Sequence, residues 1–143
     1  MKIDPDAFRA FFEDLIPFNK YLGMKLFAWD EEKLTVTSKL KLKPEFIGNP
    51  IKNMPHGGVI SSLIDVTAGT ATALSLDDLS YADRITTIDM RVDYLKPSKG
   101  NILFAESEVI RSGKRIVVVR TDVHDDYDIT IALGTNSFAI IRD

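Results

Sequence analysis

The chain has 143 residues, of which 45% are apolar and 27% are charged, and its net charge is −3 at neutral pH. This length favours one domain spanning residues 1–143, and the mixture of apolar and charged residues excludes a disordered chain. The slightly acidic balance argues against nucleic acid as a partner. Because there is no cysteine, a disulfide framework, a thiolate nucleophile and a cysteine-ligated metal are all excluded.

The N-terminal segment contains acidic residues where a signal peptide needs an uninterrupted apolar core, so we expect a cytoplasmic protein. The sequence predicts an N-terminal helical region within residues 1–17. In it a helix over 4–15 has Asp4 as N-cap and Pro5 in its first turn. One face of this helix carries an apolar stripe, which consists of Phe8, Phe11, Phe12 and Leu15. Pro17 is expected to end the helix, and the chain after it to lead into extended structure.

The rest of the chain predicts strands around one long helix. Residues 34–43 alternate apolar and polar, which is typical of a half-buried strand, and residues 44–55 form a proline-rich loop. A helix is expected over 57–76. Four further strands joined by short turns are expected at 86–95, 102–110, 116–124 and 129–141. In the first of them Ile88, Met90, Val92 and Tyr94 share one face. We therefore predict an α+β domain in which an antiparallel sheet wraps around a single central helix.

Asp65 is the only charged residue between Lys52 and Asp77. The helix around it is apolar on every side, which is typical of a buried helix, and a central aspartate with several Ser and Thr argues against a membrane span. A carboxylate in such a place either has a raised pKa or acquires hydrogen bonds, and perturbed groups of this kind mark candidate sites. Two alternatives stay open: Asp65 lies at a water-exposed end of the helix, or backbone amides satisfy it as a structural residue.

The helix opens with His56, Gly57 and Gly58. Two glycines at a loop-to-helix junction allow close backbone approach, and the first amides of a helix point outward with the positive end of its dipole. This combination can stabilise an oxyanion that develops on a carbonyl. However, Gly57 and Asp65 are eight residues apart, about 12 Å along one helix. If they act on one carbonyl, one of them must come from a second copy of the chain.

The stretch HGGVISSLID, the later strand TIDMRVDYLKP and the turn RSGKR resemble the hotdog-fold acyl-CoA thioesterases, in particular the PaaI-like group. The resemblance covers about residues 18–143. It implies a hotdog fold and hydrolysis of a fatty or aryl acyl-CoA to the free acid and CoA. It also implies a homodimer with shared active sites, commonly doubled to a tetramer. No cofactor is implied, since coenzyme A is part of the substrate.

The same resemblance implies roles for individual residues. Asp65 matches the family's general base or nucleophile, the Gly57 amide matches the group that polarises the thioester carbonyl, with Gly58 beside it, and His56 matches the histidine that orients this oxygen or the loop. An upstream asparagine of the family has two candidates, Asn49 and Asn53, and a water-positioning threonine is Thr87 or, second, Thr86.

Outside the family motif, a basic turn is a candidate for contacts with the phosphates of CoA, and two lysines are further candidates. The turn consists of Arg111, Lys114 and Arg115, and the lysines are Lys96 and Lys99. With two histidines and no cysteine we expect no metal site. Two other functions remain open: a hotdog hydratase or dehydratase that acts on acyl thioesters, and a non-catalytic acyl-CoA binding module.

Overall fold

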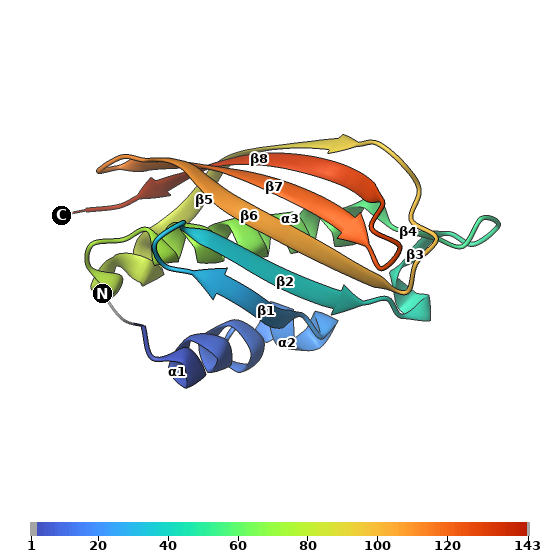
Figure 1. Ribbon diagram of the computed structural model, residues 1–143, viewed down its shortest axis with the longest axis horizontal. Helices are drawn as coiled ribbons and strands as arrows, with labels where there is room; N and C mark the ends of the chain where they lie inside the picture. Colours follow the sequence, from blue (N-terminus) through green and yellow to red (C-terminus); the bar gives the residue numbers. More distant parts are fainter. Residues whose placement is uncertain (1–2, 143) are drawn as a thin grey trace.

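The computed structural model describes residues 3–142, in which an antiparallel sheet of six strands curves around the long helix α3 (Figure 1). The strand order is β1-β2-β6-β7-β8-β5, and each neighbouring pair is antiparallel. A short pair, β3 and β4, lies in the segment that leads into α3. The predicted α+β architecture with an N-terminal helical addition is confirmed.

The helices are α1 (Pro5–Ala10), α2 (Pro17–Leu22) and α3 (Gly57–Leu74), with a π-helical turn at Phe11–Leu15 and 3₁₀ turns at Pro44–Phe46 and Leu79–Arg84. The strands are β1 (Lys25–Asp30), β2 (Thr35–Lys41), β3 (Ile47–Asn49), β4 (Met54–Pro55), β5 (Ile85–Tyr94), β6 (Ile102–Ser112), β7 (Ile116–Asp125) and β8 (Thr130–Ile140).

The core lies between α3 and the concave face of the sheet. Leu63 and Ile64 of α3 are fully buried, and the strands contribute Val36, Leu103 and Val119 to the same apolar cluster. At Gly134 of β8 an added Cβ would lie 2.5 Å from the Ile64 Cγ2, so only glycine lets the strand approach the helix this closely. This approach brings the inward face of β8 against the middle of α3.

The N-terminal region differs from the prediction after Ala10. Asp4 caps α1 as expected, because its Oδ1 accepts from the backbone N–H of Asp6 and of Ala7. The chain after Pro17 does lead into extended structure, in β1, but a second helix comes first, because this proline occupies the first turn of α2, a position that suits its fixed φ. Gly23, with a φ of 79°, ends α2.

The predicted apolar stripe of the first helix is only half buried. Phe8 and Phe12 pack in the core, whereas Phe11 and Leu15 are 41% and 69% exposed. The helix changes to a π-helical turn at Phe11, and the wider π turn moves side chains away from the positions that α-helical spacing predicts.

The strand β5 does not bury an apolar face within one chain, which corrects the expectation for residues 86–95. Its Ile88 and Tyr94 are 55% and 54% exposed. β5 is the last strand in the sheet order and carries a bulge between Thr87 and Asp89. An exposed, apolar edge strand of ten residues is an unpaired template for another strand.

By length and composition α3 could cross a membrane, with a mean hydropathy of 1.2 over Gly57–Leu74. Half of these residues are buried inside the fold, and the core helix of a globular protein meets the same criterion. The helix is therefore weak evidence for a membrane span.

Candidate active site

Asp65 lies in the middle of α3, where its carboxylate is held from two strands. The Thr87 hydroxyl of β5 and the Asn136 Nδ2 of β8 each donate to the Asp65 Oδ1 over 3.0 Å. Both hydrogen bonds reach the same oxygen. Within residues 3–142 no donor hydrogen-bonds the Asp65 Oδ2, so this second oxygen is available to a water molecule or a substrate.

Asn136 is the residue of this cluster that the sequence analysis missed. It is fully buried, and its Oδ1 has no hydrogen-bond partner among the described residues. Gly134, Asn136 and Phe138 alternate along β8 and are all buried. An amide on the buried register of an otherwise apolar strand is a signal that could have identified it.

The two candidate threonines separate clearly. Thr87, which pairs with Phe138 across the β5–β8 ladder, reaches Asp65 directly, at the strand bulge. Thr86 is exposed and pairs with Ala139, and the structure records no hydrogen bond between its side chain and Asp65. The geometry thus brings Thr87 to the carboxylate and leaves Thr86 outside the cluster.

The start of α3 shows how His56 and the two glycines are arranged. The His56 Nδ1 accepts from the Gly58 N–H over 2.8 Å, so the imidazole caps the helix and engages the Gly58 amide. The Tyr94 hydroxyl donates to the Gly57 carbonyl over 2.8 Å. In the part of the chain that the structure describes, nothing accepts from the Gly57 N–H, which leaves this amide as the free donor of the pair.

Of the two asparagine candidates, Asn49 ends β3 and Asn53 lies in the turn between β3 and β4. The Asn49 Oδ1 accepts from the N–H of Ile51 and of Lys52, each over 3.1 Å, so its side chain closes a turn. Asn53 has a φ of 53° and is exposed. Neither side chain has a hydrogen bond to His56 or Asp65 among the recorded contacts, and the structure does not bring them to the carboxylate.

The basic turn and Lys96 lie toward opposite ends of α3. The Ser112 hydroxyl, between Arg111 and Lys114, donates to the Ser75 Oγ just after the end of α3. Lys96 instead lines a cavity of about 330 Å³ that also contains Gly57 and Tyr94. Of the cationic candidates, Lys96 is thus the one that shares a cavity with the free amide.

A second, separate cavity of about 210 Å³ lies beside Asp65. Most of its walls are apolar, formed by α3, Phe138 and the N-terminal residues Phe11 and Ile16, and its polar lining residues are Asn19, Asp65, Thr70 and Thr87. Gly57 does not line it. The carboxylate and the free amide are about 12 Å apart along one helix, so within a single chain they do not meet at one point.

Comparison with known proteins shows the family to which this chain belongs. The family model described as the thioesterase superfamily matches residues 53–132. The medium/long-chain acyl-CoA thioesterase YigI of Escherichia coli K12 is 34% identical over 135 residues, which cover 87% of this chain and 86% of that protein.

Two solved structures agree with this match. A Shewanella oneidensis protein related to the thioesterase superfamily has a TM-score of 0.83 and 32% identity, over 95% of this chain and 94% of that one. A Bacillus halodurans protein solved with CoA has a TM-score of 0.65 and 31% identity, over 73% and 66% of the two chains.

The six strands wrapped around α3 form the hotdog fold. The chain belongs to the thioesterase superfamily, and the predictions of this fold and of a thioester hydrolase are confirmed.

Proposed function

We propose that this protein hydrolyses fatty acyl-CoA thioesters to the free acid and CoA, with Asp65 as the catalytic carboxylate. The observation that carries the proposal is the Asp65 carboxylate itself, held through Oδ1 by Thr87 and Asn136 at the end of an apolar cavity. The names of the relatives support the substrate class, because one is a medium/long-chain acyl-CoA thioesterase and another was solved with CoA.

The chemistry needs an oriented carbonyl, a base and a water molecule, and no cofactor beyond the CoA of the substrate. As general base, the Asp65 Oδ2 takes a proton from water while the hydroxide attacks the thioester carbon. The C–S bond then breaks, and the CoA thiolate leaves and is protonated. As nucleophile, the same oxygen attacks the carbonyl carbon, expels the thiolate and forms an anhydride that water hydrolyses. In both routes Thr87 and Asn136 fix the other oxygen.

The carbonyl oxygen requires a donor, for which we propose the Gly57 N–H of a second copy of the chain. Its freedom from other acceptors and its place in the first turn of α3 support this role. The His56 side chain holds the turn in shape through Gly58. The separation along α3 rules out the Gly57 amide of the same chain.

A homodimer formed along β5 supplies the second copy. β5 is an unpaired edge with exposed apolar side chains, among them Ile88, Met90 and Tyr94. Pairing two such edges antiparallel gives a continuous sheet with two-fold symmetry, in which each α3 faces the other. The Gly57 cavity of one chain then adjoins the Asp65 of the other, and Lys96 is the nearest cationic candidate for the CoA phosphates.

The variant Asp65→Asn tests the catalytic assignment. We expect roughly a hundredfold or greater loss of kcat in a thiol-release assay across straight-chain and aryl acyl-CoAs, because amide oxygen is no base at neutral pH. Asp83→Asn, on the exposed turn before β5, is the matched control and keeps the wild-type rate. Wild-type turnover by Asp65→Asn contradicts the assignment.

The wild-type assay also separates the rival functions. Hydration of an enoyl-CoA without thiol release identifies a hydratase, and calorimetric binding of acyl-CoA without either reaction identifies a binding module. Single turnover in ¹⁸O-labelled water tests for the nucleophilic route: label in the Asp65 carboxylate requires an anhydride that water attacks at the aspartyl carbon, because the general-base route labels the acid product alone.

A further inference from the structure

The apolar cavity beside Asp65 has one wall made by the N-terminal segment. Phe11 and Ile16 lie across it from Val66, Gly69 and Ala73 of α3. Its volume of about 210 Å³ is below the roughly 300–1,000 Å³ of pockets that enclose a drug-sized ligand. It therefore suits an acyl group and not the CoA portion of a substrate.

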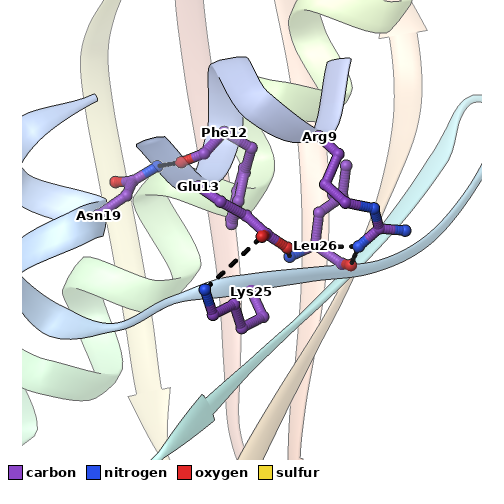
Figure 2. A network of polar contacts seen from close by, with 6 residues as sticks. All are labelled: Arg9, Phe12, Glu13, Asn19, Lys25 and Leu26. Carbon is purple, nitrogen blue, oxygen red and sulfur yellow. Dashed lines mark hydrogen bonds and ion pairs between the residues drawn. The ribbon is translucent and has the colours of Figure 1, made fainter. Parts of the chain in front are cut away.

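This wall is fixed to the sheet by a network of polar contacts (Figure 2). The Glu13 Oε1 accepts from the Leu26 N–H of β1 over 3.0 Å, and its Oε2 pairs with Lys25 at 3.6 Å. Arg9 pairs with Glu13 and also donates to the Leu26 carbonyl. In α2, Asn19 donates to the Phe12 carbonyl in the π-helical turn over 2.9 Å. The position of Phe11 is thus set by anchors on both sides of it.

Gly69 is the unusual residue of the opposite wall. Glycine in the middle of a helix is unfavourable relative to alanine, and Gly69 has no positive φ that would require it. An added Cβ would meet the Phe138 Cε1 at 3.6 Å and Cζ at 3.8 Å, which are ordinary van der Waals contacts. Gly134 is the contrast, because there a Cβ would collide with Ile64. Packing within the chain therefore does not demand glycine at position 69.

The place of Gly69 supplies a reason. It follows Asp65 by four residues, so the two lie on the same face of α3, about 6 Å apart along its axis. Ala73 continues this face by another turn, and all three line the cavity. An acyl chain whose carbonyl meets Asp65 would pass directly over Gly69, where any side chain would occupy its path.

We propose that Gly69 determines which acyl groups this protein accepts, by leaving open the cavity between α3 and the N-terminal wall formed by Phe11 and Ile16. This inference rests on the proposed acyl-CoA hydrolysis and deepens it, because it names the side of Asp65 along which the acyl chain lies. A larger residue at position 69 restricts the cavity to short acyl groups, and a smaller residue at position 11 admits longer ones.

The test measures kcat/KM by thiol release for the full chain over straight-chain substrates from butanoyl-CoA to palmitoyl-CoA. We expect Gly69→Ala to raise the Tm by about 3 °C and to shift the optimum to shorter chains. Gly69→Val should lower kcat/KM for the longest accepted substrates about tenfold or more relative to butanoyl-CoA. Phe11→Ala, on the opposite wall, should shift the optimum to longer chains, which covers the case in which Gly69→Val fails to fold.

Ser61→Val is the control, because it adds bulk to the same helix two turns earlier and outside the cavity. It should leave the chain-length profile unchanged. An unchanged profile in the position 69 and Phe11 variants overturns the inference while the activity of the wild type stands. Equal loss at every chain length, together with dissociation in a solution-mass measurement, also overturns it and makes Gly69 a contact between copies. A wild type that hydrolyses none of the substrates overturns the proposed function, and this inference with it.

Discussion

Asp65 is held asymmetrically, and this decides what its two oxygens can do. Oδ1 accepts from Thr87 and Asn136, whereas Oδ2 has no hydrogen-bond donor among residues 3–142. Hydrogen bonds to one oxygen of a carboxylate restrict its rotamer. We propose that the two donors position the carboxylate, and we expect their loss to affect turnover more than binding.

We expect Asn136→Ala to lower kcat about ten- to a hundredfold with little change in KM, since a hydrogen bond to a charged group contributes about 1.5–3 kcal/mol. Thr87→Val should also lower kcat, because it removes the other hydrogen bond to the Asp65 Oδ1. Thr87→Ser should retain activity because it keeps the hydroxyl. Steady-state kinetics with far-UV circular dichroism check both. An increase in KM alone for Asn136→Ala contradicts a positioning role.

At the scale of single residues, the sequence could predict the helix residues of the site better than the strand residues. Asp65 is conspicuous because no other charge lies within ten residues of it, and Gly57 because it follows a histidine at a helix start. Asn136 is 71 positions from Asp65, so no local pattern connects the two. Their contact depends on the strand order β7-β8-β5, which periodicity does not specify.

Among the elements, β5 is the strand whose apolar side chains are least covered by its own chain. The alternation of apolar residues along β5 predicts a buried face. The strand lies at the edge of the sheet, however, and its Ile88 and Tyr94 are more than half exposed. An alternating pattern predicts that one face of a strand is buried, but it does not indicate whether the same chain or another molecule buries it. In the N-terminal region the ambiguity concerns the local structure instead. A proline can follow the end of one helix or begin the next, and Pro17 does both.

We expect Met90→Lys, which adds a charge on the exposed edge strand β5, to convert the proposed dimer to monomers and to abolish hydrolysis while the fold is kept. Ile116→Lys is the control, because Ile116 is similarly exposed, 43% against 38% for Met90, but begins β7 beside the basic turn. Light scattering and thermal unfolding check the two variants. Active monomers of Met90→Lys would contradict the shared site.

For the whole molecule, the arrangement predicts complementation between inactive variants. Gly57→Pro removes the amide hydrogen and adds a ring at a place where the backbone accepts proline, because proline suits the first helical position and His56 before it is extended, with a ψ of 134°. Gly57→Ala, which keeps this hydrogen, is the control for the added Cβ near the Tyr94 ring. A homodimer of Gly57→Pro and one of Asp65→Asn should each be inactive.

When the two variants are mixed and allowed to exchange subunits, a mixed dimer has one doubly defective site and one intact site. Random pairing should therefore restore roughly a quarter of the wild-type rate. The measurement is thiol release after exchange, with each variant alone as the reference. Failure to recover activity in dimers shown by mass spectrometry to be mixed means that each site is built from one chain.

The spacing of Gly57 and Asp65 along α3 also ties catalysis to the amount of protein. If neither half-site works alone, the protein loses its activity, and not only its partner, when it is diluted below the dissociation constant of the dimer. In that range the rate per volume falls with the square of the protein concentration. For an enzyme whose site is complete in one chain, the rate per volume falls only in proportion to the concentration. The separation of two groups along one helix would thus make the activity per molecule depend on how much of the protein is present.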